Sequence, residues 1–126
     1  MNKIISTKLA PQAIGPYSQA IKVQNQLFAS GQIAINPATN EFVGGDITSE
    51  THQVMNNIKA LLQSEGLTFD NVFKTTVFLA DMNDFQNFNS VYATYFPNIK
   101  PARSCVQVAQ LPKNAKVEVE IIASYE

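Results

Sequence analysis

The sequence predicts a two-layer α+β domain in which two helices cover one face of a mixed sheet of about six strands. Two segments carry apolar residues at helical spacing, and the other patterned segments alternate with the period of two that is typical of strands. The 126 residues contain no internal repeat, linker or low-complexity stretch. We therefore expect residues 1–126 to form a single domain with a modest core of its own.

Composition and charge narrow the class of protein. Hydrophobic residues make up 45% of the chain, which is ordinary for a globular protein, and the net charge is −1. No run of Lys or Arg suggests a nucleic acid as partner, and no segment is apolar enough for a signal peptide or a membrane span. The single cysteine, Cys105, and the single histidine, His52, predict neither a disulfide nor a metal site. We expect a cytoplasmic protein.

The first part of the chain predicts three strands. The first covers residues 3–7, and turn residues separate it from the second, which covers residues 17–23. The third covers residues 27–30 and ends at Gly31, where a missing Cβ permits a bulge or the close approach of another group. Residues 36–45 then predict a loop.

The first helix is predicted to begin after Asp46, which has the side chain of a good N-cap, and to end at Gly66. Glu50 lies in the first turn, where a carboxylate interacts favourably with the helix dipole. Apolar residues then recur at helical spacing and predict the buried side, at Val54, Ile58, Leu61 and Leu62.

A strand over residues 71–79 leads into the second helix. Asn83 and Gln86 have the spacing of a capping box at its start, and Pro97 ends it. Asn89 lies beside its buried stripe, where the side-chain amide needs a hydrogen-bond partner. The stripe itself is predicted to be aromatic, with Phe85, Phe88, Tyr92 and Tyr95 or Phe96.

The last segment predicts two strands joined by a short turn. Within each strand the residues alternate between two faces, so that Arg103 lies beside Cys105, and Glu118 beside Glu120. If the apolar faces of the two strands lie together, Arg103 shares a face with both glutamates. Such a face is either a lattice of ion pairs or a site for an anionic ligand, because the guanidinium fork suits a carboxylate or a phosphate. The spacing leaves both interpretations open.

Several blocks of this sequence resemble the reactive intermediate deaminase (Rid, YjgF-like) family, in family order and over nearly the whole chain. The most specific is PARSCVQVAQLP followed by VEVEI, at residues 101–112 and 117–121. The others are IGPYSQA at 14–20, ASGQI at 29–33, Asn36-Pro37, KTTVF at 74–78 and DMNDF at 81–85.

The resemblance implies a chorismate-mutase-like fold, with three subunits packed around a central barrel and a ligand cleft at each subunit interface. It also implies an enzyme that needs no cofactor and hydrolyses 2-imino acids, such as 2-iminobutanoate and 2-iminopropanoate, to 2-keto acids and ammonia. These imines come from pyridoxal-phosphate-dependent dehydratases. The segment between Phe96 and Pro101 is shorter than in many relatives, which affects the mouth of the pocket.

The same resemblance implies roles for individual residues. Arg103 is expected to bind the substrate carboxylate through a bidentate pair, and Glu118 to position a water and act as its general base. Cys105 is expected to contribute backbone groups beside an inert thiol, and Glu120 to be structural. The other residues expected to line the site are Tyr17, Ser30, Gly31, Phe88 and Asn89.

Two other functions stay open. Some relatives have been described as endoribonucleases or inhibitors of translation, although the slightly negative charge and single histidine of this chain offer poor phosphate binding. The other alternative is a module that binds a small carboxylate, or holds unfolded clients, without turnover.

Overall fold

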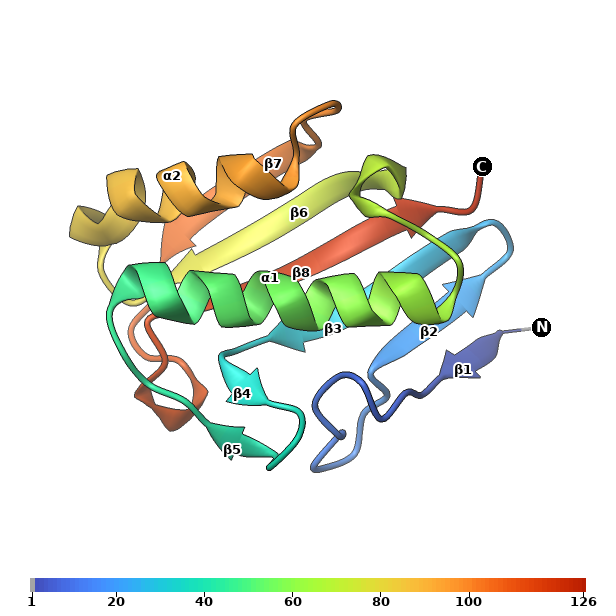
Figure 1. The fold of residues 1–126 in the computed structure, drawn as a ribbon, viewed down its shortest axis with the longest axis horizontal. Helices are drawn as coiled ribbons and strands as arrows, with labels where there is room; N and C mark the ends of the chain where they lie inside the picture. Colours follow the sequence, from blue (N-terminus) through green and yellow to red (C-terminus); the bar gives the residue numbers. More distant parts are fainter. Residues whose placement is uncertain (1) are drawn as a thin grey trace.

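A six-stranded mixed sheet forms one layer of the molecule and two helices form the other, in a computed structural model that describes residues 2–126 (Figure 1). The predicted two-layer α+β architecture is confirmed. Met1, part of the domain predicted over 1–126, lies outside the described residues. The strands of the sheet are β1 (Lys3–Ile5), β2 (Ala20–Val23), β3 (Gln26–Gln32), β6 (Val72–Leu79), β7 (Ala102–Gln107) and β8 (Val117–Ser124).

The order of the strands across the sheet is β1-β2-β3-β8-β6-β7. β6 and β7 run parallel, and every other neighbouring pair is antiparallel. β4 (Ile35–Asn36) and β5 (Glu41–Phe42) form a separate two-stranded ribbon, which begins one residue before the loop predicted over residues 36–45 and replaces part of it. The predicted strand over residues 17–23 begins later, at Ala20, because a tight turn at Gly15 precedes it, with the Tyr17 N–H donating to the Gly15 carbonyl at 2.9 Å.

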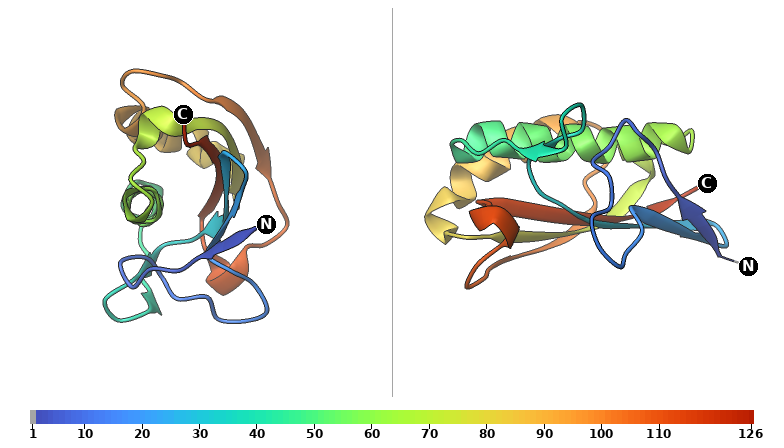
Figure 2. Two further views of the ribbon diagram at one scale, coloured as in Figure 1. Left: turned by 90° about the vertical axis from the view of Figure 1, so that its right-hand side faces the viewer. Right: turned by 90° about the horizontal axis from the view of Figure 1, so that it is seen from below.

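Both helices pack on the same face of the sheet, as the two views of Figure 2 show. α1 (Ile47–Ser64) begins after Asp46 as predicted, and the Asp46 carboxylate accepts a hydrogen bond from the Ser49 N–H at 2.8 Å. Glu50 is buried, and its carboxylate accepts from the Lys116 N–H at 2.9 Å. This bond ties the start of α1 to the start of β8.

α2 (Phe85–Tyr95) differs from the sequence prediction at its start. Asn83 lies inside a 3₁₀ turn, Met82–Asp84, and does not cap the helix. The Asp81 carboxylate accepts from the Asn83 N–H at 2.9 Å, so Asp81 is the capping residue of this turn. The predicted capping box of Asn83 and Gln86 is therefore wrong, because the 3₁₀ turn moves the N-cap position of α2 from Asn83 to Asp84.

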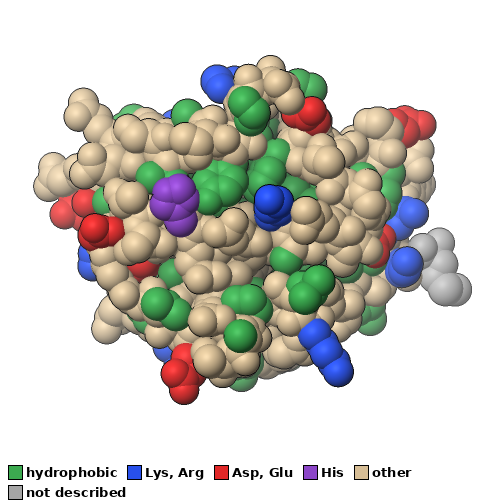
Figure 3. All heavy atoms as spheres, in the orientation of Figure 1, with side chains coloured by type: hydrophobic (Ala, Val, Ile, Leu, Met, Phe, Trp, Pro, Cys, Tyr) green, Lys and Arg blue, Asp and Glu red, His purple; other side chains and the backbone are tan. Residues whose placement is uncertain are grey.

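The core lies between the two layers. Val117, Val119 and Ile121 of β8 point into it and are fully buried, at 0%, 0% and 2% exposure. α2 contributes the predicted aromatic stripe, in which Phe88 and Tyr92 are buried with ring centroids 5.3 Å apart. Charged side chains are scattered singly over the helix-covered face in Figure 3 and form no broad basic surface among the described residues in view.

β7 and β8 do not pair with each other, because β6 lies between them. Thr75 of β6 lies opposite Arg103 on one side and Ile121 on the other, so Arg103 shares the helix-covered face with the buried Ile121. Phe78 lies opposite Glu118, which puts Glu118 on the other face. The prediction that Arg103 shares a face with Glu118 and Glu120 is therefore wrong.

The second face of the sheet has no helix over it (Figure 2). It carries Glu118 and Glu120, whereas Arg103 and Cys105 lie on the helix-covered face. It also carries apolar side chains with substantial exposure, among them Phe28 at 40% and Val106 at 46%. Among residues 2–126 no helix is long and apolar enough to span a membrane.

Candidate active site

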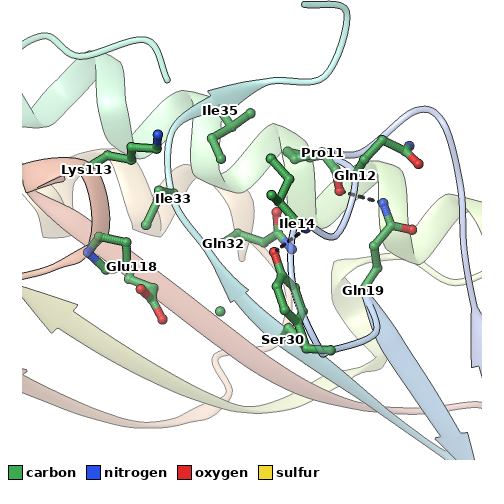
Figure 4. A pocket seen from close by; sticks show the side chains of 13 residues that line it. Pro11, Gln12, Ile14, Gln19, Ser30, Gln32, Ile33, Ile35, Lys113 and Glu118 are labelled. Atoms are coloured by element: carbon green, nitrogen blue, oxygen red, sulfur yellow. Dashed lines mark hydrogen bonds between the residues drawn. The ribbon is translucent and has the colours of Figure 1, made fainter. Parts of the chain in front are cut away.

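A cavity of about 470 Å³ opens where β3 and β8 meet the loop that follows β1 (Figure 4). Four of the residues predicted for the site line this cavity, namely Tyr17, Ser30, Gly31 and Glu118. Apolar walls surround them, with Ile33 and Ile35 on one side and Ile14 on the other. The volume and the few polar groups are typical of a site for a small molecule.

Gly31 and Glu118 form the floor of the cavity. The regular pairing of β3 with β8 shifts between Ala29 and Gln32, and Gly31 lies within this irregularity. A methyl group at Gly31 would lie 2.8 Å from Cδ of Glu118, inside the space that the carboxylate occupies. The missing Cβ therefore gives the Glu118 side chain its place beside the strand.

The electrostatic surroundings of Glu118 favour the protonated form of its carboxyl group. Partial burial removes water from the carboxylate, and the negative charge of Glu120 on the same strand adds repulsion. Both effects raise the pKa of Glu118 above its ordinary value of 4.5. A carboxylate with a raised pKa is a better proton acceptor than an ordinary surface glutamate.

Ser30 and Tyr17 line the cavity beside this floor. The Ser30 hydroxyl donates to the Ser18 carbonyl at 2.6 Å, so its proton is engaged while its oxygen can still accept a bond. The Tyr17 hydroxyl accepts from the Ile14 N–H at 3.4 Å and holds the end of the loop against the cavity. Tyr17 is 53% exposed, so its ring is a wall of the cavity and not part of the core.

Gln19 holds the loop that forms one wall, and sequence reasoning missed it. Its side chain is buried, and its Oε1 accepts from the Thr7 N–H at 2.7 Å. Its Nε2 donates to the Pro11 carbonyl at 2.6 Å and the Thr7 carbonyl at 3.0 Å. Pro11 lines the cavity, so this one amide fixes the wall in position. The sequence gives no sign of it, because only burial distinguishes Gln19 from a surface glutamine.

Asn57 holds the opposite wall of the cavity in position through hydrogen bonds of its side chain. This α1 residue is buried, and its Nδ2 donates to the carbonyls of Ile35 at 2.9 Å and Ile33 at 3.3 Å. Both partners line the cavity. A buried amide that satisfies two backbone acceptors keeps an irregular segment in a single conformation.

The other predicted residues gather around Arg103 on the opposite face of the sheet. The Arg103 Nη1 donates to the Asn89 Oδ1 at 2.7 Å, which supplies the partner that Asn89 was expected to need. The guanidinium lies over the rings of Tyr92, Phe85 and Phe88, with its carbon 5.0, 5.5 and 6.0 Å from their centroids. These rings and the amide hold the guanidinium beside α2.

Cys105 lies two residues along β7 from Arg103 and packs against the core. Burial raises the pKa of its thiol, and the nearby Arg103 charge opposes this only in part. The thiol therefore stays protonated and unreactive at neutral pH. Among the described residues, no group of three His, Cys, Asp or Glu side chains could hold a metal ion.

Comparison with known proteins identifies the family. A family model described as Endoribonuclease L-PSP matches residues 7–125. The chain belongs to this family. The resemblance to the Rid, YjgF-like proteins is thereby confirmed.

Members of the L-PSP family similar to this chain include differently named proteins. A RutC family protein of Pyrococcus horikoshii is 53% identical over 126 residues, all of both chains. A mouse protein named 2-iminobutanoate/2-iminopropanoate deaminase is 47% identical over 123 residues, 98% of this chain and 91% of its own. The crystal structure of E. coli TdcF with bound serine is 42% identical, with a TM-score of 0.93 over 98% of this chain and 99% of that one.

In this L-PSP chain the predicted site residues form two groups. Tyr17, Ser30, Gly31 and Glu118 line the cavity, and Phe88, Asn89 and Cys105 lie with Arg103 on the helix side. The register places Arg103 two strands and three positions away from Glu118, which is roughly 14 Å between Cα atoms at ordinary sheet spacings. The sheet itself separates them. A small ligand therefore cannot contact both groups within one subunit.

Proposed function

We propose that this protein hydrolyses small 2-imino acids, such as 2-iminobutanoate and 2-iminopropanoate, to 2-keto acids and ammonia, as an enamine/imine deaminase. The observation that carries the proposal is the Glu118 carboxylate, held over Gly31 in a cavity and with a raised pKa. The mouse relative is named for this activity, and TdcF holds serine, a small 2-amino acid of related shape. The proposed place of action is the cytoplasm, as the sequence predicts.

The proposed reaction requires one water and one base. Glu118 accepts a proton from a water molecule as the water oxygen bonds to the imine carbon, which gives a carbinolamine. Glu118 returns this proton to the former imine nitrogen, which completes the amino group of the carbinolamine. The carboxylate then takes the proton of the new hydroxyl group and passes it to the same nitrogen, so that the C–N bond breaks, ammonia leaves and the C=O bond of the 2-keto acid forms. Imines hydrolyse in water unaided, so orientation and a placed water are sufficient contributions from the protein.

Arg103 is proposed to bind the substrate carboxylate. A guanidinium has five N–H donors, and Asn89 accepts from one nitrogen, Nη1. The other donors are available for a bidentate pair with two carboxylate oxygens. The surrounding rings limit the motion of the guanidinium, which reduces the entropy lost when the ligand binds.

The separation of the two groups supports an assembly in which each site spans two subunits. We propose a homotrimer, in which Arg103 of one subunit faces the Glu118 cavity of its neighbour. The uncovered face of the sheet, with Phe28 and Val106 exposed, is the surface that such an assembly would bury. Cyclic assemblies repeat one heterologous contact around the ring, so every subunit supplies both halves.

The test couples the protein to a threonine or serine dehydratase and traps free imine with semicarbazide. The wild-type protein is expected to reduce the amount of trapped imine, and Arg103→Ala to leave it as high as in buffer. Equal trapping with wild type and with Arg103→Ala would contradict the proposal.

A further inference from the structure

Lys113 adopts a backbone conformation that suits glycine or asparagine better than lysine. Its φ and ψ are 59° and 21°, in the left-handed region, and φ of the following Asn114 is 54°. The turn is closed by the Asn114 N–H, which donates to the Leu111 carbonyl at 3.1 Å. A turn with Pro at its second position and a positive φ at its third favours Gly or Asn at that third position. A lysine there costs free energy, because its Cβ crowds the backbone.

A lysine at this position provides a positively charged side chain, which a glycine lacks. Lys113 lines the cavity, and Figure 4 shows its side chain extending from the turn toward the wall that contains Ile33. Among the described residues that line the cavity, it carries the only positive charge. The single ion pair among residues 2–126, Lys3 with Glu65, does not involve it. Its charge is therefore available to a ligand.

The cavity has a specific need for a positive charge. Its floor carries Glu118, which is negative when it acts as a base, and Glu120 lies next along the same face of β8. A 2-imino acid is itself an anion, so these two carboxylates repel it. Within one subunit Arg103 lies on the opposite face of the sheet, so Lys113 is the positive charge that the chain itself places at its own cavity. A cation at the rim of a cavity attracts anions toward it.

We propose that Lys113 binds the carboxylate of the incoming 2-imino acid at the mouth of the cavity and guides it toward Glu118. The inference rests on the proposed function, since it assigns this residue to the anionic substrate of that reaction. The contact belongs to the approach of the substrate, so it affects KM and the dependence on salt more than kcat. The 2-keto acid product carries the same carboxylate and is bound in the same way.

The experiment compares three substitutions at Lys113. Lys113→Gly removes the charge and the backbone strain, Lys113→Gln removes the charge alone, and Lys113→Arg keeps the charge. Gln24→Gly is the matched control, because Gln24 also has a positive φ of 53° and does not line the cavity. Binding of 2-oxobutanoate is measured by calorimetry, and imine hydrolysis is measured at two salt concentrations.

Lys113→Gly and Lys113→Gln are expected to weaken 2-oxobutanoate binding and raise KM roughly two- to fivefold, the range of an exposed ion pair, with little change in kcat. Their kinetics should also depend less on salt than those of the wild type. Lys113→Arg and Gln24→Gly should behave as wild type. Thermal unfolding of Lys113→Gly should occur at the wild-type temperature or above it, which excludes misfolding as the cause of weaker binding.

The two proposals fail in distinguishable ways. If the wild-type protein hydrolyses no imine while the Lys113 variants bind 2-oxobutanoate more weakly, the proposed reaction is wrong and the carboxylate site stands. If the wild type hydrolyses imine and Lys113→Gly and Lys113→Gln match it in KM, binding and salt dependence, the role of Lys113 is overturned.

Discussion

The carboxylate of Glu118 lies over the backbone of Gly31, in the space that the Cβ of any other residue would fill. This contact joins β3 to β8 at the floor of the cavity, where the pairing of the two strands is irregular. The position of the proposed base therefore depends on a residue that contributes no side chain.

Gly31→Ala is expected to displace the Glu118 carboxylate and lower imine hydrolysis about 100-fold, since small misplacements of reacting groups have effects of that size. The free energy of unfolding should fall by about 1–3 kcal/mol because of overpacking. Gly66→Ala is the control, because Gly66 has a φ of 71° and nothing within 4 Å of an added methyl. It should lose about 1 kcal/mol of stability and keep full activity. Equal activity of the two variants would contradict the prediction.

Glu118→Gln is expected to lower hydrolysis by a factor of about 10²–10⁴, the usual contribution of a general base. The same substitution should raise stability at neutral pH. Because the pKa of Glu118 is raised by folding, the folded chain holds the proton more tightly than the unfolded chain and loses stability as the pH rises through that pKa. Glutamine removes this loss. Denaturant unfolding at pH 5 and pH 8 measures it, and a variant less stable than wild type at pH 8 would contradict the sign.

Glu120→Gln is expected to move the acid limb of the pH–rate profile to lower pH. The charge of Glu120 contributes to the raised pKa of Glu118, after burial, so its removal lowers the pH at which Glu118 becomes an effective base. The measurement is kcat/KM from pH 4 to pH 8. An unchanged limb would mean that burial alone controls Glu118.

Mixing two inactive variants tests whether each site spans two subunits. If Arg103→Ala and Glu118→Gln chains are unfolded together and refolded as mixed trimers, half of the arginine positions and half of the glutamate positions are intact. About a quarter of the sites then combine both residues and recover activity. A mixture of Glu118→Gln with Gly31→Ala should recover nothing, because both changes affect the same half of the site. Recovery in the second mixture, or none in the first, would contradict the arrangement.

Gln19→Leu is expected to reduce stability by about 3 kcal/mol, because several backbone groups lose a buried hydrogen-bond partner. Amide hydrogen exchange at Thr7 should become faster, since its N–H donates to the Gln19 side chain. Gln12→Ala is the matched control, as Gln12 makes only exposed bonds in the same loop, and it should change stability by less than about 0.5 kcal/mol. A Gln19→Leu protein as stable as Gln12→Ala would show that the loop is held by other contacts.

Residue patterns predicted most of the elements of this fold. The spacing of apolar residues and the Asp46 cap located α1, and the aromatic stripe with Phe88 and Tyr92 located α2. These signals are local, so they can be found in a single sequence. The start of α2 was misplaced because Asn83 and Gln86 have the spacing of a cap, whereas the preceding Asp81 satisfies the backbone.

The error over Arg103 has a topological cause. The alternation of residues correctly placed Arg103 on the same face of its strand as Cys105, and Glu118 on the same face as Glu120. The sequence does not determine which residues of two strands share a face of the sheet when a third strand lies between them. The face of β7 that carries Val106 is its more apolar face, yet Val106 points away from the core and is 46% exposed. Resemblance to the family supplied the site residues, and the structure divided them into two groups.

β8 lies in the middle of the sheet, between β3 and β6, although it is the last strand along the sequence. While the chain is being synthesised, β3 and β6 therefore each have an unpaired edge until β8, which pairs with both, is available. Nascent chains with unpaired edges are prone to associate with other chains. These two edges remain unpaired until residues 117–124 have emerged from the ribosome. β8 thus both brings Glu118 to the cavity and completes the sheet. A ribosome that stalls before β8 is synthesised therefore produces a chain that has neither the proposed base nor a complete sheet.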